Sequence, residues 1–537
     1  MFTFTVKLLM KRLIVIVIIQ LGLANFSQAQ LHDKNWLFGY DGDSGSPYGI
    51  NQLIFNQDSF ELQNLNWPYW LSKTNSCMSD SSGNFLFVSN GAEVFNSVGA
   101  IMDNGSGLSP CPYTTEWGPS GLDINQGVLA LPISSSENKY VLFHEKLTYA
   151  FPDQSFEWNY SKIDMSMNGG LGKVTSKNNV LVSDTMLAVG NVTAVKHGNG
   201  KDWWVLKPTR NSNKIYEVLL NENGVSQPVL KTVNFPIFRV EGTSGSWTTF
   251  SPDGEHFAQW LLTIVPPNQP NYYLLTANFN RCTGEFYNEQ EVLFSQQLAL
   301  HGPGTIAYSP NNRFLYLSYI GYVYQFDMEA SDILGSIDTV AVYDGSHDGG
   351  LNYTFYILQP APDGKIYCSA TNSVRVMHVI NHPNVKGDCC DFRQHAVQLP
   401  AYYYCGLPNF PYFRVGPIDG SSCDTLGLDN IYEPDTTDAS YVCDSSLLVS
   451  NGMKYPPIAN VYPNPANDVL KIATNARQGL EYVATLYSLT GERVMEVSLD
   501  RMTTAVNVSE IPNGIYVVEV SNGANQTKVV RKVSVVH

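Results

Sequence analysis

Short apolar runs that follow a tight turn recur through the first four hundred residues of the chain. The clearest copies are "FSPDGEHFAQW" from Phe250, "YSPNNRFLYLSY" from Tyr308 and "QPAPDGKIYCSAT" from Gln359. Asp-Gly or Asn-Asn lets the backbone take a positive φ and reverse direction at low cost. The runs after such turns, for example Phe85–Val88 and Tyr140–Phe143, are apolar on both faces. That pattern is typical of strands packed between two neighbouring sheets.

Weaker copies of the same turn and strand bring the number of units to seven. Their first strand residues lie roughly fifty to sixty positions apart, at Trp36, Phe85, Tyr140, Trp203, Phe257, Phe314 and Ile366. A unit of about fifty residues holds the four short strands of a β-propeller blade, which cannot bury both of its faces alone. The pattern therefore predicts an all-β protein with a propeller over residues 31–415. Seven blades are favoured, six are the alternative, and eight are less favoured than either.

The last eighty residues have a different rhythm. Apolar and polar positions alternate at Val469–Ala473 and Ile515–Val520, and turns are expected at Gly491 and Gly514. This predicts a small immunoglobulin-like β-sandwich over residues 456–537. Residues 416–455 carry seven acidic side chains and one lysine without regular periodicity, so we expect an acidic flexible linker between the two domains.

Residues 1–29 have the composition of a cleavable signal peptide. Basic residues at Lys7, Lys11 and Arg12 precede the apolar run Leu13–Ala24, which is short for a membrane span. Small side chains before Gln30 predict cleavage between Ala29 and Gln30, and translation starts at either Met1 or Met10.

Composition restricts the possible partners. Hydrophobic residues make up 44% of the 537 positions, which is enough for packed cores, and the net charge of −16 argues against nucleic acid or an anionic membrane as a partner. Nine cysteines in an exported chain favour disulfide formation, although the odd number leaves one unpaired within the chain. A bridge between Cys405 and either Cys389 or Cys390 is preferred, but spacing alone does not fix the connectivity.

Searches for catalytic or metal-binding patterns single out no residue. The chain has no GxSxG elbow and no CxxC pair, and "HEKLT" at His144 lacks the second histidine of a zinc site. The loop "DGDSGS" at Asp41 is interpreted as an ordinary loop and not as a calcium site. We therefore expect no cofactor and no metal, and an enzyme is less favoured than a binding protein. The aromatic segments Trp67–Trp70 and Tyr402–Tyr404 either line a carbohydrate platform or pack in the core, and core packing is favoured.

The C-terminal sequence also resembles a known family. The succession "VYPNPANDVLKI", "ATLYSLTGERVMEV" and "IPNGIYVVEVSNGANQTKVVRKVSVV" is similar to the type A sorting domain of the type IX secretion system of Gram-negative bacteria. The resemblance implies handling by that machinery, export through both membranes, cleavage near the linker, and attachment to the cell surface or release. The positions that match the family pattern are Pro463, Asn464, Pro465, Gly491, Asn513, Gly514, Lys528, Arg531 and Lys532.

The body of the chain resembles the WD-repeat-like propellers that exported bacterial proteins carry before such a sorting domain. The resemblance rests on motifs such as "NWLFG" at Asn35, "HVINHPNVKGDCCDF" at His378 and "GLPNFPYFRVGPIDG" at Gly406. It implies a fold and a location more than an activity. The favoured hypothesis is a surface propeller that binds a glycan or a protein through its loops. One alternative is a polysaccharide hydrolase or lyase with two carboxylates about 5–10 Å apart near the axis. Another is a structural or adhesive surface component.

Overall fold

The computed structural model describes residues 30–56, 59–134, 136–148, 154–210, 212–235, 246–265, 269–294, 304–426, 428, 459–474, 482–499, 503–522 and 527–537. The predicted signal peptide, including Ala29, and most of the predicted linker lie outside these residues. None of the helices in the described ranges is long and apolar enough to cross a membrane.

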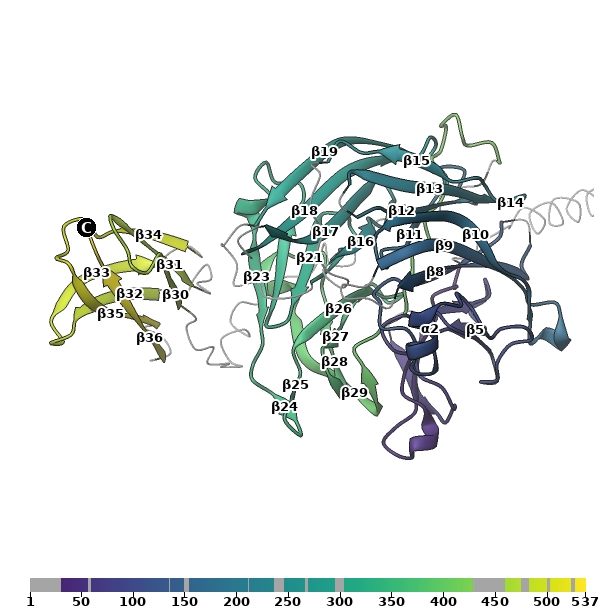
Figure 1. The fold of residues 1–537 in the computed structure, drawn as a ribbon, viewed down its shortest axis with the longest axis horizontal. Coiled ribbons are helices and arrows are strands. Elements are labelled where there is room, and N and C mark those ends of the chain that lie inside the picture. The colour runs from purple at the N-terminus through teal and green to yellow at the C-terminus, as the bar shows by residue number, and fades with distance from the viewer. Residues whose placement is uncertain are drawn as a thin grey trace, which may run out of the picture.

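Seven antiparallel sheets follow one another between Asn35 and Tyr404 (Figure 1). Most have four strands in sequence order, as propeller blades do, and the first strands of most neighbouring sheets contact one another. The predicted seven-bladed all-β propeller is thus confirmed. The sheets are β1 (Asn35–Gly39), β2 (Ile50–Phe55) and β3 (Phe60–Leu65); β4 (Ser76–Ser79), β5 (Phe85–Ser89) and β6 (Val94–Asn96); β7 (Val128–Pro132), β8 (Lys139–Thr148), β9 (Gln154–Asp164) and β10 (Lys173–Leu187); β11 (Thr193–Lys196), β12 (Trp203–Pro208), β13 (Lys214–Asn221), β14 (Gly224–Val225) and β15 (Val229–Thr232); β16 (Trp247–Phe250), β17 (His256–Val265), β18 (Gln269–Asn280) and β19 (Glu285–Leu293); β20 (Thr305–Tyr308), β21 (Phe314–Tyr319), β22 (Tyr322–Asp327) and β23 (Asp338–Val342); and β26 (Phe355–Pro360), β27 (Ile366–Ala370), β28 (Ser373–Ile380) and β29 (Phe392–Tyr404).

Short elements decorate the loops between these strands. They are the hairpin β24 (His347–Asp348) and β25 (Leu351–Asn352), the helix α2 (Pro112–Trp117), and the 3-10 turns η1 (Gly42–Ser44), η2 (Gly118–Ser120), η3 (Asn168–Gly170), η4 (Leu334–Ser336) and η5 (Gly387–Cys390).

The turns recognised in the sequence join the first and second strands of the sheets. Asp253 and Gly254 lie between β16 and β17, and Phe314 and Ile366 each begin the second strand of a sheet. We call the end of the propeller that carries these turns the bottom face, and the end at which the first strands of the second to seventh sheets begin the top face.

The first sheet lacks a strand at its inner edge, and the chain after β29 takes that place. β1 runs opposite to the neighbouring inner strand β4, because Leu31 bonds Ser81 beyond the end of β4 and Gly39 bridges Leu71 before its start. Residues 406–415 run in the direction of β4, from Asn409 beside Asn75 to Arg414 beside Asp33. N-terminal and C-terminal residues therefore close the ring together.

Aromatic side chains seal this junction. Trp36 on β1 is fully buried, and its ring lies 5.8 Å from that of Tyr367 on β27 and 6.3 Å from that of Phe410. On β2, the side chain of Asn51 exchanges two hydrogen bonds with the backbone of Ala401, at 3.0 and 3.1 Å. Burial of such large aromatic side chains contributes much of the hydrophobic stabilisation where the propeller closes.

A buried ion pair links the third and fourth sheets. Glu145 on β8 and Lys207 on β12 are 2.8 Å apart, and both side chains are fully buried. The backbone of Gly190 satisfies both groups, since its N–H donates to Glu145 and its carbonyl oxygen accepts from Lys207. A buried pair that is satisfied in this way fixes geometry, because neither partner is tolerated alone.

The C-terminal domain is a sandwich of two antiparallel sheets, as predicted. Its core consists of apolar side chains such as Leu470, Leu486, Val518 and Val533. One sheet is β30 (Ala459–Tyr462), β31 (Val469–Thr474) and β34 (Thr503–Asn507), and the other is β33 (Arg493–Leu499), β32 (Tyr482–Ser488), β35 (Gly514–Asn522) and β36 (Thr527–Val535).

Candidate functional site

The centre of the propeller is filled by the chain itself. The side chain of Asn409 donates hydrogen bonds to the carbonyl oxygens of Val128 and Val192, at 3.0 and 3.1 Å, and so joins the starts of the third and fourth inner strands. Gly406 allows the segment to pass, because a Cβ there would lie 1.9 Å from the carbonyl oxygen of Ser72. Residues 406–415 therefore run through the axis from the top face to the bottom face.

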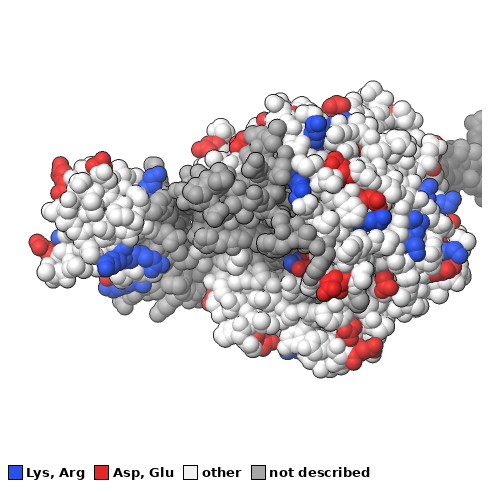
Figure 2. Space-filling model, in the orientation of Figure 1, with Lys and Arg blue, Asp and Glu red and all other residues white. Residues whose placement is uncertain are grey.

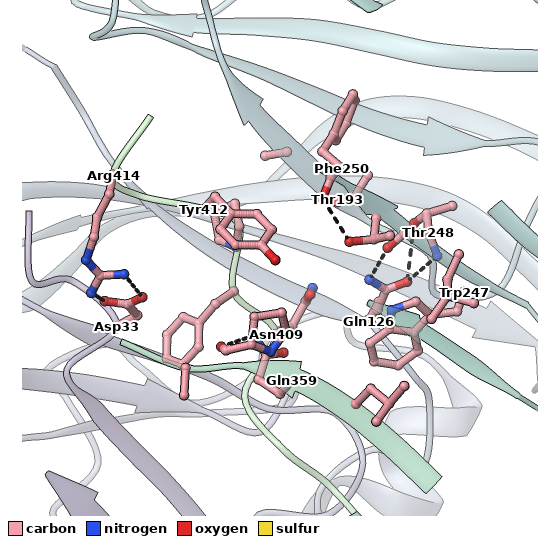
Figure 3. A pocket seen from close by; sticks show the side chains of 18 residues that line it. Asp33, Gln126, Thr193, Trp247, Thr248, Phe250, Gln359, Asn409, Tyr412 and Arg414 are labelled. Carbon is pink, nitrogen blue, oxygen red and sulfur yellow. Dashed lines mark hydrogen bonds and ion pairs between the residues drawn. The ribbon is translucent and has the colours of Figure 1, made fainter. Parts of the chain in front are cut away.

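A small cavity of about 50 Å³ remains beside this segment (Figure 3). Among the described residues that line it, Asp33 is the only acidic one, and Arg414 holds its carboxylate at 2.5 and 2.9 Å. Gln126 and Thr248 bond each other across the cavity wall. The pair of free carboxylates that the hydrolase alternative requires is thus not formed by these lining residues.

The segment leaves at the bottom face, where it is fastened. The guanidinium of Arg281 donates to the backbone carbonyl oxygens of Gly416 and Lys196. A disulfide then joins Cys282, in the turn after β18, to Cys423, with 5.5 Å between the two Cα atoms.

Two expectations about this region are corrected. Cys390 and Cys405 are free thiols, so neither Cys389 nor Cys390 pairs with Cys405. The two ends of β29 pair with the two ends of the eight-residue β28 and so lie roughly 23 Å apart, whereas a disulfide needs Cα atoms within about 7 Å. The predicted linker is also anchored over its first residues, since Gly416 is buried and Ile418 bonds Gly198.

The predicted cleavage point lies near the same face. Gln30 is the first described residue, and its side-chain oxygen accepts a hydrogen bond of 2.6 Å from Lys196. Burial, with a smaller effect from the nearby Arg281, lowers the pKa of Lys196 to about 7.

Four aromatic side chains from three segments of the chain meet on the top face, and we call them the platform. They are Tyr40, Tyr48, Trp70 and Tyr402. The ring of Tyr40 lies 4.9 Å from that of Trp70 and 6.0 Å from that of Tyr48, which lies 5.6 Å from that of Tyr402. Tyr48 is 39% exposed, and the other three rings are partly exposed.

The two predicted aromatic segments are divided between platform and core. Trp70 and Tyr402 belong to the platform, whereas Tyr69 stacks on Phe95 at 3.6 Å and Tyr403 is fully buried. The sequence analysis missed Tyr40 and Tyr48, which lie in the loop between β1 and β2.

Polar groups hold the platform in place. Asp41 accepts hydrogen bonds from the indole of Trp70 and from the backbone of Ser44. Burial acts to raise the pKa of Asp41, but these bonds prevail and lower it. The hydroxyl of Tyr40 bonds Ser373, and burial raises the pKa of Tyr40 to about 12, so this group stays protonated at neutral pH.

The described residues contain no group of three or more His, Cys, Asp or Glu side chains that could hold a metal ion. Asp41, at the start of the loop "DGDSGS", caps η1.

In the sandwich, the residues of the sorting motif lie at turns and on one strand. Pro463, Asn464 and Pro465 precede β31, Gly491 takes a φ of 85° in a turn, and Asn513 and Gly514 lie at the start of β35. Asn464 links its turn to β36, because its side chain bonds the backbone of Lys532 and Ser534. Lys528, Arg531 and Lys532 are exposed on β36, and Figure 2 shows basic side chains gathered on this part of the domain.

Residues 460–536 match the family described as "Secretion system C-terminal sorting domain". No curated protein matches the chain.

Several solved structures resemble the chain at low identity. A protein of unknown function from Desulfotomaculum acetoxidans is 14% identical, with 70% of this chain and 100% of that chain covered and a TM-score of 0.34. A periplasmic gluconolactonase from Pseudomonas aeruginosa is 12% identical, with 70% and 99% covered and a TM-score of 0.39. A quinoprotein alcohol dehydrogenase-like protein from Bacteroides thetaiotaomicron is 12% identical, with 70% and 77% covered and a TM-score of 0.33.

The fold follows from the sheets of this chain, and the destination follows from its tail. A type IX sorting domain implies handling by the type IX secretion machinery and export across the outer membrane to the cell surface or the medium. The chain is an exported β-propeller protein that carries a C-terminal sorting domain of the type IX secretion system.

Proposed function

We propose that the propeller binds a carbohydrate at the platform on its top face. The observation that carries the proposal is the convergence of Tyr40, Tyr48, Trp70 and Tyr402 with Tyr48 still 39% exposed. Rings that served only to pack the core would be covered, as Tyr403 is. Exposed tyrosine and tryptophan rings offer a flat apolar surface with polar edges. This surface suits a sugar ring, which has an apolar C–H face and hydroxyl groups around it.

The platform is fixed before a ligand arrives. The backbone N–H of Tyr402 donates to the carbonyl oxygen of Pro47 at 2.9 Å, which ties β29 to the loop that carries Tyr48. The carboxylate of Asp41 is held by Trp70 and Ser44. A preformed site loses little conformational entropy on binding, so even a few stacking contacts give measurable affinity.

The hydrolase alternative has less support. The segment 406–415 fills the axis, and Asp33, the acidic residue of the axial cavity, is neutralised by Arg414. Binding at the rim of the top face needs neither an open channel nor a second carboxylate.

The test uses the mature chain, residues 30–537, in affinity electrophoresis and calorimetry against a panel of soluble bacterial and plant polysaccharides. Tyr48→Ala is expected to weaken binding at least tenfold. The matched control is Tyr287→Ala, because Tyr287 is 46% exposed on β19, in a different sheet. If the wild-type chain binds no polysaccharide, or if both variants bind equally well, the proposal is wrong. A purely structural or adhesive surface component would give that result.

A further inference from the structure

An arginine that forms no ion pair with the described residues lies at the edge of the platform. Arg375 on β28 stacks over Tyr402, with 5.2 Å between its guanidinium carbon and the ring centroid. Its Nε atom is buried and has no hydrogen-bond partner. No carboxylate of the described residues forms an ion pair with it, in contrast to Arg313, Arg393 and Arg414.

The acidic groups of this region contact residues of the platform and not Arg375. Asp348 lies at the hydroxyl of Tyr402, 3.5 Å away, and Asp41 is bound by Trp70 and Ser44. A guanidinium keeps its charge at every physiological pH and presents its N–H donors in a rigid planar fork. The two Nη groups of Arg375 are not buried as its Nε is, and no described residue accepts a hydrogen bond from them, so a ligand that supplies an acceptor there gains affinity.

We infer that the platform takes an acidic sugar, with Arg375 binding a carboxylate of the ligand while a neighbouring sugar ring rests on Tyr48. This inference rests on the proposed carbohydrate binding and adds the ligand class, a polysaccharide that contains uronic acid. The planar guanidinium fork matches a carboxylate by two parallel hydrogen bonds, and its stacking on Tyr402 holds the fork in one orientation.

The test compares three soluble probes on the mature chain. They are an oligogalacturonate, the same oligosaccharide with its carboxylates reduced to alcohols, and a sulfated oligosaccharide of similar length. The wild-type chain is expected to bind the oligogalacturonate at least tenfold more tightly than the reduced form, with an advantage that shrinks as salt is raised. A preference for the sulfated probe over the oligogalacturonate would overturn the assignment of a carboxylate.

Variants identify the residue responsible. Arg375→Met keeps much of the side-chain length and is expected to lower affinity for the oligogalacturonate to the level of the reduced probe, with binding of the reduced probe unchanged. Arg375→Lys is expected to restore only part of the loss, because a lysine cannot form the planar fork. Equal binding of acidic and reduced probes by the wild-type chain would overturn this inference and leave the proposed function standing. If Tyr48→Ala abolishes binding but the wild-type chain shows no preference for the acidic probe, the carbohydrate proposal stands and only the inference about Arg375 is overturned. Because the reduced probe changes the ligand and not the protein, it decides the question even if Arg375→Met does not fold.

Discussion

The disulfide between Cys282 and Cys423 is expected to stabilise the propeller strongly. The perturbation is the double variant Cys282→Ser and Cys423→Ser. The two cysteines are 141 residues apart in sequence, so the bond closes a long loop in the unfolded chain. In the chain-entropy model a loop of this length removes about 17 cal/mol/K of unfolded-state entropy, which corresponds to about 5 kcal/mol at 25 °C. Because engineered and natural bridges span about 0–5 kcal/mol, this value is an upper bound.

The assay is urea unfolding followed by tryptophan fluorescence. All nine tryptophans lie between Trp36 and Trp260, so the signal reports the propeller and not the sorting domain. Cys111→Ser is the control, because Cys111 is a half-buried free thiol that lies directly before α2, between β6 and β7. The double variant should lower the unfolding midpoint by an amount equivalent to several kcal/mol, and the control by less than about 1 kcal/mol. If the double variant unfolds at the wild-type midpoint, the reasoning that the Cys282–Cys423 disulfide stabilises the propeller is refuted.

Two further predictions concern buried ionisable groups. Glu145→Gln removes the carboxylate that balances the buried Lys207, so it should cost about 3–5 kcal/mol in the same assay, whereas Asp103→Asn at an exposed ion pair should cost less than about 1 kcal/mol. Equal costs would contradict the buried-pair argument. Burial, with a smaller effect from a nearby lysine, lowers the pKa of His144 to about 3, below its unfolded value of about 6.5. The unfolded chain then binds the proton more readily, so the contribution of His144 to stability is kept above pH 6.5 and lost as the pH falls toward 3, by about 2 kcal/mol at pH 5. His144→Gln should reduce the stability difference between pH 7 and pH 5 by that amount, and an unchanged difference would count against a buried neutral ring.

The sequence predicted the blades because each carries its own signal. The turns before Phe257, Phe314 and Ile366 combine a local backbone preference with an apolar run, and both are visible within a dozen residues. The same alignment placed Trp36 with the second strands of the other sheets. In the structure Trp36 lies on β1, which is second from the axis because residues 406–415 take the inner position of the first sheet. What the sequence did not reveal is that residues 406–415 supply the missing inner position, since that contact joins segments almost four hundred residues apart.

The disulfide prediction was wrong and the platform was predicted only in part, and both results have the same cause. Cys405 and Cys390 are close in sequence, but the long strand β29 carries them to opposite faces. Trp70 and Tyr402 were noticed because aromatic residues cluster around them, and Tyr40 and Tyr48 were missed because they stand alone in a loop. Pairings across the ring depend on the closed fold, and no local pattern encodes them.

The chain leaves the propeller at the bottom face, and the platform lies on the top face. Everything beyond Cys423 starts from the face that bears the strand turns, while Tyr48 and its neighbours occupy the opposite side. A mechanical load on the chain after Cys423 would be carried first by the covalent bond to Cys282, before any of it reached residues 406–415.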